Sequence, residues 1–186
     1  MKVTPELDRR FRDAAAAAGD LDAGYDMVDT PIGAIFVAAT PAGLCRIAYD
    51  PEPERVVESL ARTVGVRVLR SSRSVDETRR QLDEYFEHRR TEFDLAIDLR
   101  VADGFARRVL DALVHVPYGE VTTYGELARR ADHPRAARAV GTVMHRNPIP
   151  IVLPCHRVIG ASGNLVGYGG GLERKEALLR LEGALL

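Results

Sequence analysis

The hydrophobic pattern of this chain changes near residue 100, and that change limits its possible folds more than any other feature. Between Tyr25 and Arg100, short runs rich in β-favouring residues are separated by turn sequences. After Asp103 the apolar residues recur at helical spacing. A chain of 186 residues is long enough for two small domains, each with its own core. The sequence therefore predicts an α+β fold in which a mixed domain precedes a mainly helical one.

The first of these domains is expected to combine a sheet with two helices. Apolar and polar side chains alternate from Phe93 to Leu99, which predicts a half-buried strand at its end. Residues 1–24 precede the domain as an extension with one short helix. Further strands are predicted at residues 25–30, 33–40, 44–50 and 66–69, and helices at residues 51–65 and 74–90. The expected divisions of the chain are residues 1–24, 25–100 and 101–186.

The second domain contains the pattern of a helix-turn-helix. Thr123 and Glu126 have the spacing of a capping box, which predicts a helix over residues 124–131. Pro134 is well placed as the first residue of the next helix, which runs to His145. Helical hairpins that bind no DNA share this pattern, so it does not establish DNA binding on its own.

The helix that ends at His145 has an unusual outward face. At 100° per residue, Ala136, Val140 and Val143 lie together and are expected to pack inward. Arg138 points away from them. Small residues around a single arginine indicate a helix whose backbone approaches another surface closely while the arginine projects into it.

Charge alone does not identify a partner. Residues 1–100 carry 15 basic and 19 acidic side chains, whereas residues 101–186 carry 11 basic and 8 acidic ones. The second half is basic enough to bind a polyanion, but ordinary solvated surface charge explains the excess at least as well. Only Lys2 and Lys175 of the 26 basic residues are lysines. Genomic base composition explains this preference for arginine as easily as phosphate binding does.

No targeting or membrane segment is evident in the sequence. No apolar run approaches the roughly 20 residues that span a bilayer, and the charged residues 1–13 lack the apolar core of a signal peptide. We therefore expect a cytoplasmic protein, nucleoid-associated if bacterial. A disulfide framework is not expected there. Cys45 lies within a predicted strand, which favours a buried structural thiol.

The other cysteine, Cys155, lies between an apolar run and a His-Arg pair. Prolines bracket residues 150–154, which predicts an extended and buried approach to the thiol. Residue types alone leave its role open. A nucleophile needs a base such as His156 and nearby positive charge to form the thiolate, whereas a structural thiol needs neither. A zinc site would need more ligands, and adjacent Cys155 and His156 are poorly placed to chelate one ion.

A set of motifs separates these alternatives. They are Pro154-Cys155-His156-Arg157-Val158, residues 147–150 and 135–141 before it, residues 116–124, and residues 170–172 with the helix that follows to residues 181–183. In order and spacing they resemble the O6-alkylguanine-DNA alkyltransferase family, the methylated-DNA–protein-cysteine methyltransferases. The resemblance is dense from Phe105 to Gly183 and looser from Asp29 to Arg100. It implies a small ribonuclease-H-like α/β domain followed by a helix-turn-helix, winged-helix-like domain.

The resemblance also implies a reaction and its catalytic residues. The family moves an alkyl group from O6 of guanine, or O4 of thymine, to its own cysteine, so each protein molecule acts once. By resemblance Cys155 is the acceptor, and His156 draws off its proton through a water. Glu182 orients that histidine, Asn147 hydrogen-bonds near the thiol, and Tyr124 donates a proton to the leaving guanine. No cofactor is implied.

Further residues are implied to hold the DNA. The partner is double-stranded DNA, bound through its minor groove by a monomer, and the damaged base is flipped out. Arg138 fills the space that the base leaves. The other contacts implied are Thr122 and Thr123 to phosphate, Ala137, Ala139 and Gly141 on the helix in the groove, and Val158, Tyr168, Gly169 and Gly170 around the base.

This chain departs from some relatives in two ways. Before position 100, only Cys45 and His88 could serve as the Cys and His ligands of the zinc ion that some relatives carry, so no metal is expected. Residues 169–171 are all glycine and offer only backbone amides to the base oxygen. Two rival functions are a non-enzymatic lesion binder of the same fold, which would lack the acceptor cysteine, and a helix-turn-helix regulator, which would leave Cys155 and Glu182 unexplained.

Overall fold

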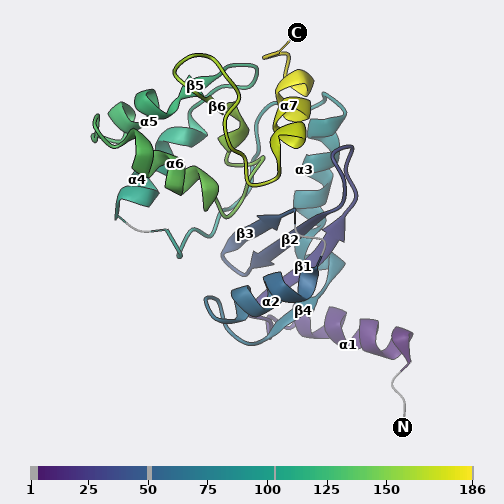
Figure 1. Cartoon of the computed structure of the whole chain (residues 1–186). Helices are drawn as coiled ribbons and strands as arrows, with labels where there is room; N and C mark the ends of the chain where they lie inside the picture. The colour runs from purple at the N-terminus through teal and green to yellow at the C-terminus, as the bar shows by residue number, and fades with distance from the viewer. Residues whose placement is uncertain (1–3, 50–51, 103, 186) are drawn as a thin grey trace. The chain divides into compact units, whose positions relative to one another are not determined.

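The computed structural model describes residues 4–49, 52–102 and 104–185 of the chain (Figure 1). They divide into two compact units, one ending at Asp98 and one beginning at Leu99. The first unit contains a four-stranded sheet with helices, and the second is mainly helical. The predicted α+β fold is therefore confirmed.

The sheet of the first unit has the strand order β3-β2-β1-β4. Its strands are β1 (Ala23–Val28), β2 (Ile35–Thr40), β3 (Gly43–Ala48) and β4 (Val68–Arg70). β1, β2 and β3 pair antiparallel in succession, whereas β4 pairs parallel with β1. The parallel pairing requires a crossover, which the helix α2 (Pro53–Ala61) provides between β3 and β4.

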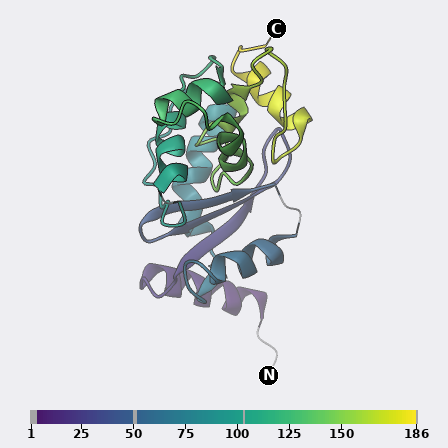
Figure 2. The ribbon, with the colours of Figure 1, turned by 60° about the vertical axis from the view of Figure 1, so that its left-hand side comes forward.

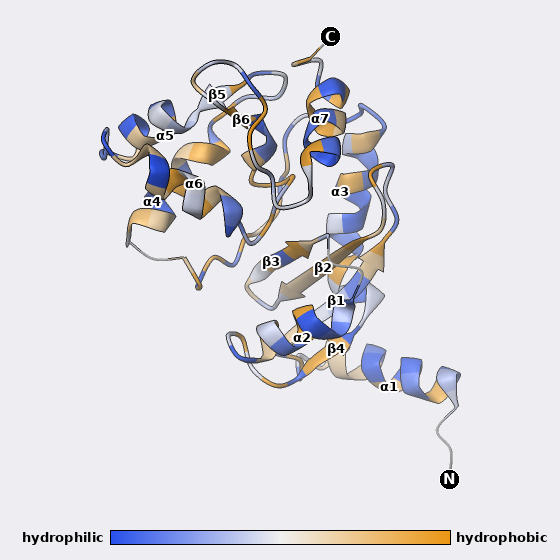
Figure 3. Cartoon of the chain, viewed as in Figure 1, coloured by the Kyte–Doolittle hydropathy of each residue, from blue (hydrophilic) through white to orange (hydrophobic). Residues whose placement is uncertain are grey.

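Helices lie on both faces of this sheet, as its edge-on view shows (Figure 2). On one face, Val56 and Leu60 of α2 pack with Phe36 and Ala38 of β2 and with other strand residues. On the other face lie the 3-10 turn η1 (Ser72–Val75) and α3 (Asp76–Phe86). Because neighbouring side chains alternate along a strand, β2 buries residues on both faces. The strand is correspondingly apolar along its length (Figure 3).

The extension before the sheet forms the helix α1 (Pro5–Ala17), which the Thr4 hydroxyl caps by accepting from the Leu7 amide. None of its residues is buried, and Leu7 and Phe11 are exposed. Hydrophilic and hydrophobic residues are mixed along α1 (Figure 3). The helix therefore adds little to the core of the first unit.

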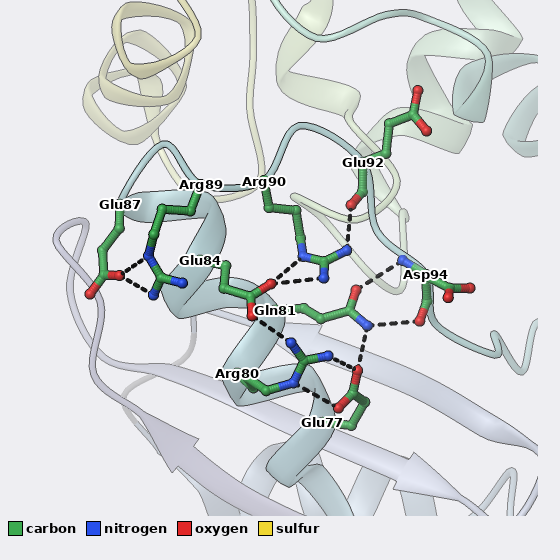
Figure 4. A network of polar contacts seen from close by, with 9 residues as sticks. All are labelled: Glu77, Arg80, Gln81, Glu84, Glu87, Arg89, Arg90, Glu92 and Asp94. Carbon is green, nitrogen blue, oxygen red and sulfur yellow. Dashed lines mark hydrogen bonds and ion pairs between the residues drawn. The ribbon is translucent and has the colours of Figure 1, made fainter.

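The predicted strand from Phe93 to Leu99 is wrong. Only one isolated bridge, between Ile97 and Leu44, joins this segment to the edge of the sheet. Figure 4 shows why pairing does not extend: the Gln81 side-chain amide takes both backbone groups of Asp94, donating to its carbonyl over 2.8 Å and accepting from its amide over 2.9 Å. The backbone hydrogen bonds of Asp94 therefore go to a side chain of α3 instead of to a strand.

The second unit consists of helices around a two-stranded parallel sheet. The helices are α4 (Gly104–Val114), α5 (Tyr124–Arg130), α6 (Ala137–His145) and α7 (Leu172–Leu181), and the strands are β5 (Thr122–Thr123) and β6 (Val158–Ile159). Its core includes Leu110, Leu113, Leu127, Val140 and Leu178. The pairing of Thr122 with Val158 brings the start of α5 beside the segment that carries Cys155.

The helix-turn-helix differs from its prediction at one point. α6 begins at Ala137, and Pro134 is not its first residue. The Ala136 amide donates to the His133 carbonyl over 2.9 Å, so Pro134 and Arg135 occupy the centre of a turn. Proline is favoured at the first central position of such a turn. Within α6, Val140 is buried and Arg138 is exposed, as the helical spacing predicted. Met144, for which no prediction was made, is also buried.

No helix among the described residues is both long and apolar enough to cross a membrane.

Candidate active site

Cys155 begins a short 3-10 turn, η2 (Cys155–Arg157), and is buried. The approach to it is buried as predicted but is not extended. The Leu153 amide donates to the Ile149 carbonyl over 2.9 Å, which closes a turn, and Ile151 takes a φ of 76°. A β-branched residue in this left-handed region is strained by about 1–3 kcal/mol. The burial of the whole segment holds this conformation in place.

Asn147 ties the turn to the thiol. Its Nδ2 donates to the Leu153 carbonyl over 2.8 Å, and its Oδ1 accepts from the Ile149 amide over 3.1 Å. Its side chain also hydrogen-bonds Cys155. The same amide group therefore fixes both the strained turn and the position of the sulfur.

The carboxylate of Glu182 is the centre of a buried polar cluster. His156 Nε2 lies 2.9 Å from Glu182 Oε1. Arg157 donates through Nε to Oε2 and through Nη2 to Oε1, each over 2.8 Å, and through Nη1 to the Val116 carbonyl over 2.6 Å. The Gly119 amide donates to Oε2 over 3.4 Å. Gly119 has a φ of 76°, and its left-handed turn brings this amide to the carboxylate.

These contacts define the charge of Glu182. Burial by itself would raise the pKa of its carboxyl, but hydrogen bonds from His156 and Arg157 outweigh burial and lower the pKa to about 2. The carboxylate is therefore ionised near neutral pH and can only accept hydrogen bonds.

An ionised Glu182 sets the tautomer of His156. Its Nε2 must carry the proton that is donated to Oε1, which leaves the lone pair on Nδ1. Burial lowers the pKa of His156, although Glu182 acts in the opposite direction, so the ring is neutral at neutral pH. Nδ1 is buried and has no hydrogen-bond partner among the residues that the structure describes. The imidazole thus has the protonation state of a general base.

The thiol has opposing influences around it. Burial raises the pKa of Cys155 to about 11, because a thiolate is poorly solvated inside the protein. Hydrogen bonds from Asn147 and Tyr168 and the positive charge of Lys175 act to lower it. The site therefore holds a mostly protonated thiol that already has groups in place to stabilise its thiolate.

Tyr124, the first residue of α5, lies beside this thiol. Burial raises the pKa of its phenol, and the nearby Cys155 raises it further. The phenol consequently keeps its proton and can act as a donor. Gly141 of α6 faces the same ring, since a Cβ at this glycine would lie 3.8 Å from Cε1 of Tyr124.

The two threonines before Tyr124 lie differently. Thr123 is half-buried and caps α5 by accepting from the Glu126 amide over 3.2 Å. Thr122 is buried, and its Oγ1 is inaccessible and has no partner among the described residues. The prediction that Thr122 contacts a phosphate is at odds with this burial, because its side chain points into the unit.

The remaining predicted residues fall into two groups. Arg138 and Ala139 are exposed on α6, where Ala137 and Gly141 are half-buried. Around the thiol, Val158 and Gly170 are buried, Tyr168 is half-buried and Gly169 is exposed. Tyr168 hydrogen-bonds Cys155 in this structure. The structure thus brings Tyr124, Asn147, His156, Tyr168 and Glu182 together around Cys155 or its histidine.

Two buried cations were not assigned a role from the sequence. In the sequence Arg157 is only a member of the motif around Cys155, and the fold shows its two hydrogen bonds to Glu182. Lys175 is fully buried in α7. Its signal was present in the sequence, because Lys175 shares a helical face with the apolar Leu178 and Leu179.

Comparison with known proteins identifies both units. Residues 24–99 match the family model described as "6-O-methylguanine DNA methyltransferase, ribonuclease-like domain". Residues 104–184 match the one described as "6-O-methylguanine DNA methyltransferase, DNA binding domain". The matches cover most of the chain and leave out the whole of α1.

Relatives match over nearly their whole length. A methylated-DNA–protein-cysteine methyltransferase of Mycolicibacterium paratuberculosis is 45% identical over 158 residues, which cover 85% of this chain and 91% of that protein. One of Methanosarcina barkeri is 40% identical, with 85% and 96% covered. Among solved structures, Mycobacterium tuberculosis OGT in complex with DNA is similar with a TM-score of 0.76 and 41% identity, over 87% of this chain and 93% of that one. The sequence, the fold and the buried cysteine site agree, and the chain belongs to the methylated-DNA–protein-cysteine methyltransferase family.

Proposed function

We propose that this methyltransferase repairs DNA in a single-turnover reaction: it flips an O6-alkylguanine or an O4-alkylthymine out of the duplex and transfers the alkyl group to Cys155. The observation that carries the proposal is the chain of buried groups from Cys155 and His156 to the ionised Glu182. A structural thiol requires no such neighbours.

The reaction begins with the proton of the thiol. His156 takes it on Nδ1, directly or through a water, and the Nε2–H bond to Glu182 stabilises the imidazolium that forms. The sulfur anion then attacks the alkyl carbon. A carbon–sulfur bond forms as the bond between that carbon and O6 breaks, and the electron pair of the broken bond stays on the base.

The departing base and the product explain the single turnover. Tyr124, which keeps its proton because burial raises its pKa, donates a proton to the guanine as it leaves. The product on Cys155 is a thioether, which has no carbonyl carbon that water could attack. The protein is therefore not regenerated, and one molecule repairs one lesion.

The buried thiol requires the base to leave the helix, because the alkyl carbon is inaccessible inside a stacked duplex. The side chains around Arg138 on α6 are small, so the helix can enter the minor groove of the DNA. The guanidinium of Arg138 then fills the space that the flipped nucleotide leaves. Thr123 at the start of α5 contacts a phosphate of the DNA backbone. We expect the protein to act as a monomer, because one unit supplies both the groove helix and the acceptor.

Mass spectrometry tests the proposal directly. After incubation with duplex DNA that contains O6-methylguanine, the intact protein should gain the mass of one methylene group, located on the peptide with Cys155, and never more than one. The Cys155→Ala variant should bind the same DNA without any gain. An unmodified wild-type protein, or an adduct on Cys45, would contradict the proposal. A parallel incubation with O4-methylthymine tests the second substrate.

A further inference from the structure

Lys175 is a buried cation beside the site that the proposed reaction has not used. It is among the largest fully buried side chains of the protein. Its Nζ donates to the Val158 carbonyl over 2.6 Å and to the Val166 carbonyl over 2.8 Å. No ion pair of Lys175 occurs within the described part of the chain. Burying a cation without a carboxylate partner costs several kcal/mol, so its presence needs an explanation.

Its two acceptors lie on two segments that follow Cys155 in the chain. Val158 begins β6, three residues after Cys155, and pairs with Thr122 just before Tyr124. Val166 opens the glycine-rich segment that leads to Tyr168. Lys175 therefore joins the strand that follows Cys155 to the loop that carries Tyr168.

Helix stability does not explain this lysine. Lys175 lies in the first turn of α7, where the helix dipole disfavours a positive charge. The chain also uses arginine almost everywhere else, since only two of its 26 basic residues are lysines. An ammonium is a compact point charge with three donors, whereas a guanidinium is a broad planar group. A compact charge suits a buried position that must serve two carbonyls and a nearby anion.

We infer that Lys175 is a positioning residue of the acceptor site: its ammonium, held by the carbonyls of Val158 and Val166, fixes the two segments that follow Cys155 and stabilises the thiolate that attacks the alkyl carbon. The inference rests on the proposed function only in what the thiolate attacks. The sulfur anion that forms when His156 takes the proton then pairs with the buried cation.

The pKa shifts have the signs that this pairing requires. Burial lowers the pKa of Lys175 to about 8, while Cys155 acts to raise it. Lys175 in turn acts to lower the pKa of the thiol. The other charged or titratable groups around this pair are His156 and Arg157 on η2, Tyr124 on α5, Tyr168 on the loop and Glu182 after α7. Glu182 is already neutralised by Arg157, so Lys175 is the cation left for the sulfur.

Two variants separate charge from hydrogen bonding. Lys175→Met removes both, and Lys175→Gln keeps an amide donor for one carbonyl but removes the charge. Arg180→Met is the matched control, because it removes a positive charge from the exposed face of the same helix. Circular dichroism and thermal melting establish that each variant is folded before its chemistry is compared.

The readout is the rate at which iodoacetamide alkylates Cys155 in the absence of DNA. Peptide mapping monitors this rate from about pH 5 to about pH 10. Near neutral pH both Lys175 variants should react at least about tenfold more slowly than the wild type, and their pH profiles should move to higher pH by about one unit or more. Arg180→Met should match the wild type. In the wild type itself, the rate should rise less than tenfold per pH unit above about pH 8, because Lys175 loses its proton there.

Two results from the variants would overturn the inference. One is a Lys175→Gln variant with the wild-type pH profile. The other is a slowing by the same factor at every pH, which is the behaviour of a purely structural clamp. The wild-type profile remains decisive if neither variant folds, since a full tenfold rise per unit through pH 8 to 9 would exclude the charge effect. The proposed function fails separately, through the absence of a methyl adduct from O6-methylguanine DNA.

Discussion

His156 donates from Nε2 to Oε1 of Glu182 over 2.9 Å, and both side chains are buried. The two residues are 26 positions apart in the chain and belong to different elements. This one bond selects the tautomer of the imidazole, because an ionised carboxylate can only accept. It thereby leaves the free lone pair on Nδ1, the nitrogen that the proposed reaction uses as its base.

Replacing Glu182 with glutamine tests this relationship. Glu182→Gln keeps the shape of the side chain but removes the charge that stabilises the imidazolium, so methyl transfer from O6-methylguanine duplex should slow by about a hundredfold or more. Binding of unmodified DNA should change little. The rate is measured by quenched-flow transfer of a labelled methyl group. Glu176→Gln, an exposed change on α7, is the control, and equal rates in both variants would exclude Glu182 from the reaction.

The same carboxyl predicts how stability depends on pH. The pKa of Glu182 is about 2 in the folded protein and 4.5 ordinarily, so its stabilising effect is complete above about pH 4.5 and is lost as the pH falls toward 2. The first unit also has carboxyls with lowered pKa, namely Asp22, Asp26, Glu77 and Glu84. The contribution of Glu182 is therefore the difference between wild-type and Glu182→Gln melting temperatures, which should shrink across that range. A difference independent of pH would contradict the assignment.

Arg138 should matter for duplex DNA and much less for a free base. If it fills the space of the flipped nucleotide, Arg138→Ala loses that support, and repair of O6-methylguanine in a duplex should slow by about tenfold to a hundredfold because unstacking costs a few kcal/mol. Reaction with free O6-benzylguanine should fall far less, since no base has to leave a helix. Arg107→Ala removes an exposed arginine from α4 as the control. Equal losses on both substrates would remove Arg138 from the flipping step.

Replacing Cys45 should leave methyl transfer intact, whereas replacing Cys155 should abolish it. Cys45 is buried in β3 and donates from its Sγ to the Ala38 carbonyl over 3.3 Å, as a structural thiol does. Cys45→Ala should therefore retain the full transfer rate and lose about 1 kcal/mol of unfolding free energy. Chemical denaturation and the transfer assay measure the two quantities. A loss of transfer in a folded Cys45→Ala protein would contradict a purely structural role.

Local patterns in the sequence determined most of the helices and the strands of the first sheet. The capping box at Thr123 starts α5 where the spacing predicted, because capping is a contact between residues three apart. The order of the motifs around Cys155 likewise indicated the family, which the comparisons confirm. Such features depend on neighbours along the chain and can be read without knowing the fold.

Only the tertiary structure decided where distant groups meet. The strand expected from Phe93 to Leu99 is lost because Gln81 takes the backbone hydrogen bonds of Asp94. Thr122 has the residue type of a phosphate contact, yet its pairing with Val158 buries it. Arg157 and Lys175 look like two more basic residues in the sequence. Their burial beside Glu182 and Cys155 gives them their chemistry, because charge placement and desolvation depend on packing between segments far apart in the chain.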